Sequence, residues 1–306
     1  MTDATTGALA DQTSPLPTDQ PRLQEGPAMH EFTVSDQPRL RVEVGPNDVD
    51  IDARETDQIL VDFDADPDDE ATRTLLERAT IEQHGDEVVV TLPRRSGFVR
   101  RTPKIGVRIT VPLGCRVDVR AESGDVTTRG RLGDASFKAG SGELRVEHAA
   151  DLRAQSGSGD VTAGTSDGTA TVTTGSGDVM MRLVGGSARL ATGSGDIRVE
   201  RSDGPIQVNT GSGDVSIDST EADITANTAS GDQHLSRVAR GRIRLNSASG
   251  DIHVGVVDGT AVWLDVNTLS GSVNSALSGG EPPTEGEDTV ELKVNTVSGD
   301  IALARA

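Results

Sequence analysis

The chain has 306 residues, of which 2% are aromatic, and its 29 basic and 49 acidic residues give a formal net charge of −20. So acidic a surface repels phosphate groups, which argues against binding to nucleic acid or to anionic membranes. Cys115 is the only cysteine, so no intrachain disulfide is possible, as is typical of a protein in a reducing compartment.

Residues 1–29 are rich in Thr, Asp, Gln and Pro and hold few large apolar side chains. They cannot bury enough surface to offset the entropy of ordering, and we expect a disordered tail. The segment lacks the basic and apolar regions of a secretory signal peptide. No stretch approaches the roughly 20 apolar residues of a membrane span, and the chain ends at Ala306 without a hydrophobic anchor. We therefore expect a cytoplasmic protein.

Residues 30–116 show short runs in which apolar and polar residues alternate, as in half-buried strands. A helix is expected over 69–78 with Asp68 as its cap, and His84–Glu87 reads as a hairpin turn. We expect this strand-rich portion either to continue the repeats that follow it or to cap them. The expected strands lie within 32–34, 40–44, 49–51, 60–63, 88–92, 107–111 and 117–119.

A basic run follows at 94–108, where no acidic residue occurs. It is either a solvated loop that balances the acidic strands or a docking patch for an acidic partner. Four arginines of this run are candidate contacts with a partner: Arg94, Arg95, Arg100 and Arg101.

Residues 117–306 repeat a Ser-Gly-Asp turn or a close variant of it. Successive turn serines are 17 to 19 residues apart over most of this region, and the last two steps are 21 and 28 residues. A fixed period of this size is the signature of a solenoid built from stacked coils. The turn serines are Ser123, Ser141, Ser158, Ser176, Ser194, Ser212, Ser230, Ser249, Ser270 and Ser298.

Two pairs of apolar residues recur in each coil. In the coil that begins at Ser176, Val179 and Met181 form the first pair, and Ala188 and Leu190 form the second. A spacing of about nine residues between pairs disfavours the three-sided coil of hexapeptide repeats. The sequence therefore predicts an all-β fold, a parallel two-sheet β-solenoid resembling a β-helix or β-roll, with about 18 residues per coil.

Stacking would place the acidic residue of every turn in one row, with neighbours about 5 Å apart. Hydrogen bonds from turn N–H groups or serine hydroxyls would offset the repulsion, and this structural role is the favoured interpretation. A calcium ion between coils is the alternative, with Asp160, Asp178, Asp196 and Asp214 as candidate ligands. The full row is Asp125, Glu143, Asp160, Asp178, Asp196, Asp214, Asp232, Asp251 and Asp300.

Two further sets of polar residues would stack in the same way. His234 and His253 occupy the same position in adjacent coils, but a metal site would need more ligands. Asparagines three residues before a turn serine are expected to form a hydrogen-bonded ladder with a structural role. They are Asn209, Asn227, Asn246, Asn267 and Asn295.

The sequence contains no arrangement typical of an active site. Residues 175–178 resemble a glycine-rich phosphate loop, but they lack a lysine and lead into a strand. A polysaccharide-cleaving β-helix enzyme is disfavoured by the lack of tyrosine and the single tryptophan. We therefore expect a protein that is not an enzyme and that needs no cofactor.

The two longest steps hold the features that differ from the repeat. The 21-residue step contains Trp263, and the 28-residue step contains a loop at 278–288 that is rich in Gly and Pro. Loops on solenoids often carry a binding face, so Trp263 is a candidate partner contact.

The repeats resemble a bacterial family of β-strand-repeat proteins of unknown function that carries the label "putative adhesin". The matching features are Val111–Gly114, Ala121–Val126, the turn at 297–301, and the Thr-Gly-Ser-Gly-Asp turns at 174–178, 192–196 and 210–214. The resemblance implies a non-enzymatic interaction module and supplies no catalytic residues.

Three roles follow from these features. The first is a scaffold that binds a protein partner or assembles with itself, because solenoid ends expose strand edges. The alternatives are an exported surface adhesin, with or without calcium, and the polysaccharide-active enzyme.

Overall fold

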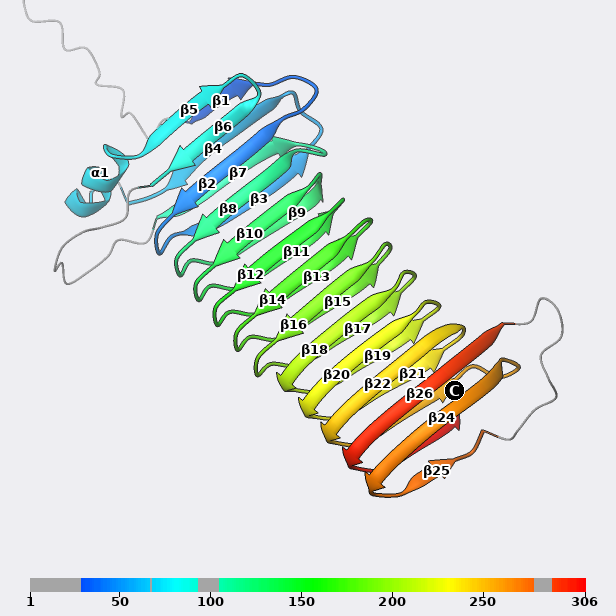
Figure 1. The fold of residues 1–306 in the computed structure, drawn as a ribbon. Helices are drawn as coiled ribbons and strands as arrows, with labels where there is room; N and C mark the ends of the chain where they lie inside the picture. The colour runs from blue at the N-terminus through cyan, green and yellow to red at the C-terminus, as the bar shows by residue number, and fades with distance from the viewer. Residues whose placement is uncertain (1–28, 67, 93–104, 278–287) are drawn as a thin grey trace, which may run out of the picture.

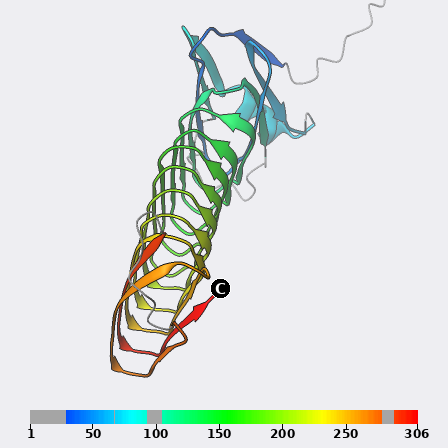
Figure 2. The same ribbon diagram turned by 90° about the vertical axis from the view of Figure 1, so that its right-hand side faces the viewer.

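Two β-sheets face each other along the whole length of the molecule (Figure 1). The computed structural model describes residues 29–66, 68–92, 105–277 and 288–306. Turned by 90°, the molecule appears as a stack of flattened coils (Figure 2). Residues 1–28 of the expected disordered tail, residues 94–104 of the basic run and residues 278–287 of the expected loop lie outside the described residues.

The described residues form 14 strands in one sheet, called sheet A. In spatial order they are β1 (His30–Thr33), β4 (Gln58–Asp64), β7 (Gly106–Pro112), β3 (Asp48–Arg54), β9 (Val126–Leu132), β11 (Leu144–Ala149), β13 (Val161–Ser166), β15 (Val179–Val184), β17 (Ile197–Ser202), β19 (Val215–Thr220), β21 (Gln233–Val238), β23 (Ile252–Val256), β27 (Ile301–Arg305) and β25 (Val273–Ser275).

Sheet B has 13 strands. From the C-terminal end of the stack they are β24 (Ala261–Ser270), β26 (Thr289–Ser298), β22 (Gly241–Ser249), β20 (Ile224–Ser230), β18 (Ile206–Ser212), β16 (Ala188–Thr192), β14 (Ala170–Thr174), β12 (Leu152–Ser156), β10 (Ala135–Ala139), β8 (Arg116–Ala121), β2 (Arg39–Val44), β6 (Glu87–Thr91) and β5 (Thr80–His84).

Each coil contributes one strand to each sheet, and its strands pair in parallel with those of the next coil. Val179 of β15 lies opposite Ile197 of β17, and Ala188 of β16 lies opposite Ile206 of β18. Both offsets equal the 18-residue period, so every apolar pair meets its equivalent one coil away. The predicted two-sheet parallel solenoid is confirmed.

The core between the sheets is a thin layer of mostly aliphatic side chains. Val172, Leu190 and Val208 follow one another through sheet B and are fully buried. Alternation along each strand points these residues inward and the polar residues between them outward. Phe137 is the largest fully buried side chain, which fits a narrow interior with few aromatics.

The N-terminal end of the stack is closed by antiparallel strands and a helix. Strand β1 pairs antiparallel with β4, and β5 pairs antiparallel with β6. Helix α1 (Glu70–Leu76) buries Leu75 against the core. The expected cap was wrong by one residue, because the carboxylate of Asp69, and not that of Asp68, accepts the N–H of Ala71.

The coils do not stack in the order in which the chain makes them. At the C-terminal end, β26 lies between β22 and β24, and β27 lies between β23 and β25. At the other end, β2 and β3 lie between the coil of β6 and β7 and the coil of β8 and β9. Among the repeats of 117–306, the expectation that each coil is stacked on the one before it is therefore wrong at the C-terminal end.

The glycine of the Ser-Gly-Asp corner sets how closely the coils approach. A Cβ on Gly195 would lie 2.0 Å from the carbonyl oxygen of Gly177, one coil away. The same clash recurs along the stack, and Gly299 would meet Gly250 while Gly271 would meet Gly299. The column of glycines thus follows the spatial order of the coils. Only a residue without a side chain fits between two corners at this spacing.

We expect Gly195→Ala to lower the free energy of unfolding by about 3 kcal/mol or more, because the obstructing atom is backbone and cannot move aside. Gly85→Ala is the matched control, since Gly85 has φ of +63° but no atom within 4 Å of its added Cβ. That variant should lose only about 1 kcal/mol, from backbone strain. Urea denaturation of both variants measures the difference, and equal losses would contradict the close approach.

Candidate binding surfaces

The acidic row is satisfied by backbone groups of neighbouring coils. Oδ1 of Asp178 accepts the N–H of Asp196 at 2.8 Å, and Oδ1 of Asp196 accepts the N–H of Asp214 at 2.8 Å. The series continues across the reordered end, where Oδ1 of Asp251 accepts the N–H of Asp300 and that of Asp300 accepts the N–H of Ser272. Each of these aspartate carboxylates therefore bonds one coil to the next.

Glu143 has a different partner at its position in the row. Its N–H donates to Asp125, but its longer side chain forms an ion pair with Arg145 on the outer face of sheet A. The row is therefore a set of backbone bonds made by aspartates. In the described part of the chain, no group of three or more His, Cys, Asp or Glu side chains is arranged to hold a metal ion.

Buried threonines complete the same corner and were missed at the sequence level. The hydroxyl of Thr192 accepts the N–H of Gly195 at 3.0 Å and donates to the carbonyl oxygen of Gly177 at 3.1 Å. Thr174 makes the equivalent pair of bonds one coil earlier. The recurring Thr-Gly-Ser-Gly-Asp pattern was the signal, because its threonine occupies the same place in several corners.

The asparagines form the expected ladder on the outer face of sheet B. Nδ2 of Asn227 donates to Oδ1 of Asn209 at 3.0 Å, and Nδ2 of Asn246 donates to Oδ1 of Asn227 at 2.9 Å. The ladder then runs through Asn295 to Asn267, again in spatial order. This prediction is confirmed, and the side chains are engaged with one another.

The His234 and His253 rings are adjacent, with centroids 6.0 Å apart and planes tilted by 42°. Two rings supply too few ligands for a closed metal site.

The lone thiol is buried. Burial raises the pKa of Cys115 to about 12, so the thiol stays protonated and unreactive near neutral pH.

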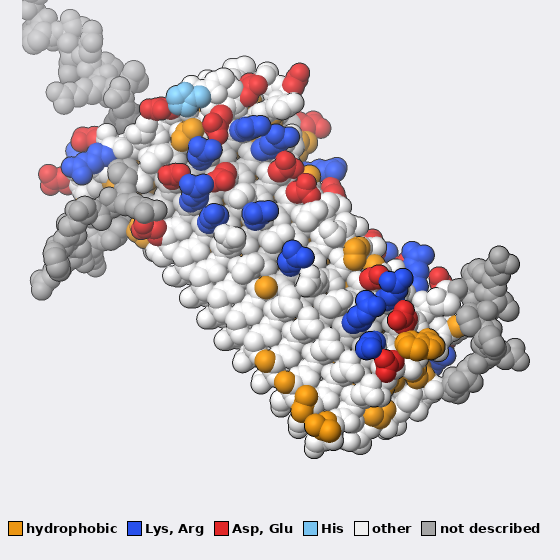
Figure 3. All heavy atoms as spheres, viewed as in Figure 1, with side chains coloured by type: hydrophobic (Ala, Val, Ile, Leu, Met, Phe, Trp, Pro, Cys, Tyr) orange, Lys and Arg blue, Asp and Glu red, His pale blue; other side chains and the backbone are white. Residues whose placement is uncertain are grey.

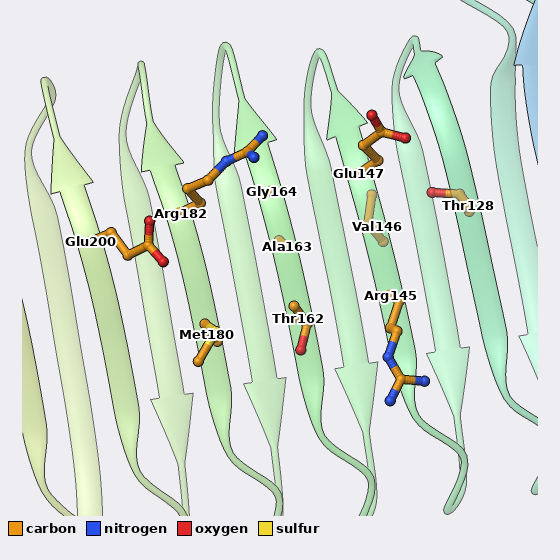
Figure 4. Close-up of a pocket in the computed structure, with 10 residues that line it drawn as sticks. All are labelled: Thr128, Arg145, Val146, Glu147, Thr162, Ala163, Gly164, Met180, Arg182 and Glu200. Carbon is orange, nitrogen blue, oxygen red and sulfur yellow. The ribbon is translucent and has the colours of Figure 1, made fainter.

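A shallow hollow of about 300 Å³ lies on the outer face of sheet A. Gly164 lines it, and Met180 projects beside Thr162 in the same depression (Figure 4). Its charged rim holds two arginines and two glutamates, so it favours neither anions nor cations. The four are Arg145, Arg182, Glu147 and Glu200.

Apolar side chains gather at the C-terminal end of the solenoid (Figure 3). Trp263 and Leu269 project from β24 with 59% and 83% of their surface exposed. Val297, on the adjacent strand β26, is also exposed. The sequence analysis selected Trp263 but missed Leu269. The signal was the residue before each turn serine, which grows from Gly211 through alanine to valine and leucine in the last coils.

The core is open at this end. Leu264 of β24 points inward but is 38% exposed, whereas Leu292, opposite it on β26, is fully buried. Val273 of β25 is likewise exposed, and Ile301 opposite it is buried. At the N-terminal end, by contrast, the covering strands leave Val88 and Val90 fully buried. The two ends therefore differ, and only one of them presents core residues to solvent.

The charged side chains of β24 and β26 form ion pairs. Nζ of Lys293 lies 3.0 Å from Oδ2 of Asp265, and Nε of Arg242 lies 3.5 Å from Oε2 of Glu291. The Lys293 ammonium and a hydrogen bond from Asn267 lower the pKa of Asp265. All charged side chains of β24 and β26 are thus paired, although the whole chain is strongly acidic.

The proposed basic patch is only partly visible. Arg108, at its end, forms an ion pair with Asp64, as expected for a counter-charge to the acidic strands. The partner-contact candidates of that patch lie outside the described residues: Arg94, Arg95, Arg100 and Arg101.

A protein-family model matches most of the chain. A family model described as Toastrack DUF4097 matches residues 38–304. A search of curated protein sequences finds no match. Among the described elements, no helix is long and apolar enough to cross a membrane.

Several solved structures have some likeness to this chain. A putative lipid binding protein from Parabacteroides distasonis is 16% identical with a TM-score of 0.47, covering 92% of this chain and 97% of its own. A putative adhesin from Parabacteroides merdae is 12% identical with a TM-score of 0.38, covering 92% and 97%. A putative adhesin from Bacteroides fragilis is 12% identical with a TM-score of 0.33, covering 92% and 98%.

We expect a chelator to leave the melting temperature unchanged, because the Oδ1 atoms of Asp160, Asp178, Asp196 and Asp214 each accept a backbone N–H. Thermal melts with EDTA and with added calcium test this. A rise in melting temperature that depends on calcium and disappears in Asp178→Asn would contradict the structural role.

Acid should weaken the last corner of the row. The N–H and hydroxyl of Ser272 lower the pKa of Asp300 from its ordinary 3.8. The folded state therefore holds this proton less tightly, so the stabilisation is complete above pH 3.8 and is lost as the pH falls through the lower folded pKa. As the pH is lowered from above 3.8, the urea midpoint of Asp300→Asn should change less than the midpoint of the wild type. An identical pH dependence would rule out this contribution.

Proposed function

The chain belongs to the Toastrack DUF4097 family, and from that premise we propose that it is a non-enzymatic interaction module that binds a polypeptide partner. The observation that carries the proposal is the open C-terminal end of the solenoid. There, inward-facing Leu264 and outward-facing Trp263 and Leu269 are all exposed together. Terminal repeats of solenoids ordinarily carry a polar cap, and an uncapped apolar end is typical of a surface that another molecule covers.

The regularity of the stack supports a role that does not involve catalysis. An active site needs one position that differs from the rest, with titratable groups whose pKa values are tuned by their surroundings. Here the polar side chains of successive corners make the same bond at successive levels, as in Asp178, Asp196 and Asp214. The exceptional positions are the apolar residues at the C-terminal end, which suit binding.

The continuous ladders also suit a scaffold. Backbone pairing connects every coil to its neighbours, the aspartate row reinforces most of the corners, and the asparagine row reinforces the coils from Asn209 to Asn267, so the stack is held along its corner and its face at once. Such a body can hold a terminal surface in a fixed orientation. The partner surface is β24 with the adjacent part of β26.

We expect a photo-crosslinking amino acid at Leu269 to form covalent adducts with another polypeptide in cells that produce the protein. Met180 is the matched control, because it is an exposed apolar residue in the middle of sheet A. Mass spectrometry of the adducts identifies the partner. Absence of a polypeptide adduct at position 269, or equal yields at 269 and 180, would contradict the proposal.

A further inference from the structure

Strand β24 presents an unprotected edge at the C-terminal end of sheet B. It is ten residues long, and among the described strands it pairs with β26 alone. Natural edge strands are usually short or carry lysines and prolines that prevent pairing with another chain. Residues 261–270 contain neither, and their single charge, Asp265, is neutralised by Lys293. The edge is therefore free to accept a further strand.

The backbone bonds of β24 show which residues would make that pairing. The N–H of Ala261 donates to the carbonyl oxygen of Asp288, next to β26. Successive residues of a strand turn their backbone groups to opposite sides. Val262, Leu264, Val266 and Thr268 therefore direct their N–H and C=O groups away from β26, toward the open side.

Neither the N-terminal end nor the sequence of residues 278–287 supplies a suitable strand. The N-terminal end finishes in antiparallel strands β1 and β5, which carry Glu31 and Glu82 and have a covered core behind them. Residues 278–287 contain Pro282 and Pro283 as their only apolar residues, and proline disfavours strand pairing. A head-to-tail filament is thus disfavoured, and the same edge of a second copy remains.

We propose that two copies join through antiparallel pairing of their β24 strands, about a two-fold axis at Val266. This deepens the proposed function, on which it rests, by naming the partner as a second copy of this chain. Such an interface is isologous, so each contact occurs twice. The β-sheets of the two copies become continuous, and the exposed core residues of both ends come together.

The register follows from the sequence of the strand. Centring on Val266 places Leu264 opposite Thr268 of the second copy, both with outward-directed backbone groups that can bond. On the outer face it places Trp263 opposite Leu269, and Asp265 opposite Asn267. Cross-strand pairs of this kind stabilise an antiparallel sheet. Centring on Asp265 instead would set two aspartates face to face, which is unfavourable.

The charge distribution permits this contact between two acidic molecules. The ion pairs Lys293–Asp265 and Arg242–Glu291 engage every charged side chain of β24 and β26, so the repulsion of two chains of net charge −20 is not concentrated on these strands. Screening by salt reduces the remaining long-range repulsion. We therefore expect association to strengthen when the salt concentration rises.

Sedimentation equilibrium of the purified full chain tests the proposal. The wild type should sediment at twice the 31.8 kDa chain mass. Trp263→Lys with Leu269→Lys places two lysines opposite each other on both sides of the axis and should convert the protein to monomer. Trp263→Lys with Leu269→Glu places lysine opposite glutamate and should retain the dimer. Both side chains are exposed, so melting curves should confirm that neither double variant unfolds.

Each result decides the proposal. A wild type that stays monomeric at all concentrations overturns it, as does a double-lysine variant that remains a dimer. If the lysine–glutamate variant is as monomeric as the double-lysine variant, the register is wrong. If the purified chain is monomeric but position 269 crosslinks to a different polypeptide in cells, self-pairing fails while the interaction module stands.

Discussion

The contact between successive Ser-Gly-Asp corners is the constraint on which the rest of the structure depends. At each corner a glycine without a side chain lets the next coil approach, as at Gly195 above Gly177. The aspartate beside it then bonds to the N–H of the next aspartate. The glycine allows a close approach at the corner, and the aspartate supplies a hydrogen-bond acceptor there. Together they fix the spacing between coils, which is the spacing that parallel pairing in both sheets requires. The aliphatic core is therefore aligned by its corners.

The two ends of the stack show how a repeat protein treats its exposed coils. At the N-terminal end, antiparallel strands and α1 cover the core, and Val88 and Val90 are buried. At the C-terminal end, the outermost coil is regular enough to stack but has no cover of its own, so Leu264 is exposed where Leu292 is buried. The same two sheets therefore have a covered N-terminal end and an open C-terminal end.

Much of the fold could be predicted from the sequence, because the period and the apolar pairs act locally. Val179 and Met181 specify a strand face whichever coil lies beside them, and the asparagine ladder follows from spacing alone. The order of the coils could not be predicted in this way. The corners at Gly250 and Gly299 each carry an aspartate that can accept the N–H of any neighbouring corner, so their residues do not say which neighbour each one takes. The corner at Gly271 carries Ser272 in place of that aspartate, which fits its place at the end of the row. The apolar end depends on that order, and therefore only Trp263 could be singled out, as an unusual residue.

The reordered coils at the C-terminal end affect how the protein is made. Strands β24 and β25 leave the ribosome before β26 and β27, yet in the folded molecule they lie outside them. Before β26 has been synthesised, the edge of β22 is free and β24 can pair with it. That pairing would put β24 in the place that β26 occupies in the folded molecule, with a similar contact between corners. The final arrangement requires the later coil to occupy that place. The order of synthesis and the order of stacking thus differ at the C-terminal end, and a competing pairing of β24 with β22 is open to the nascent chain until β26 has been made.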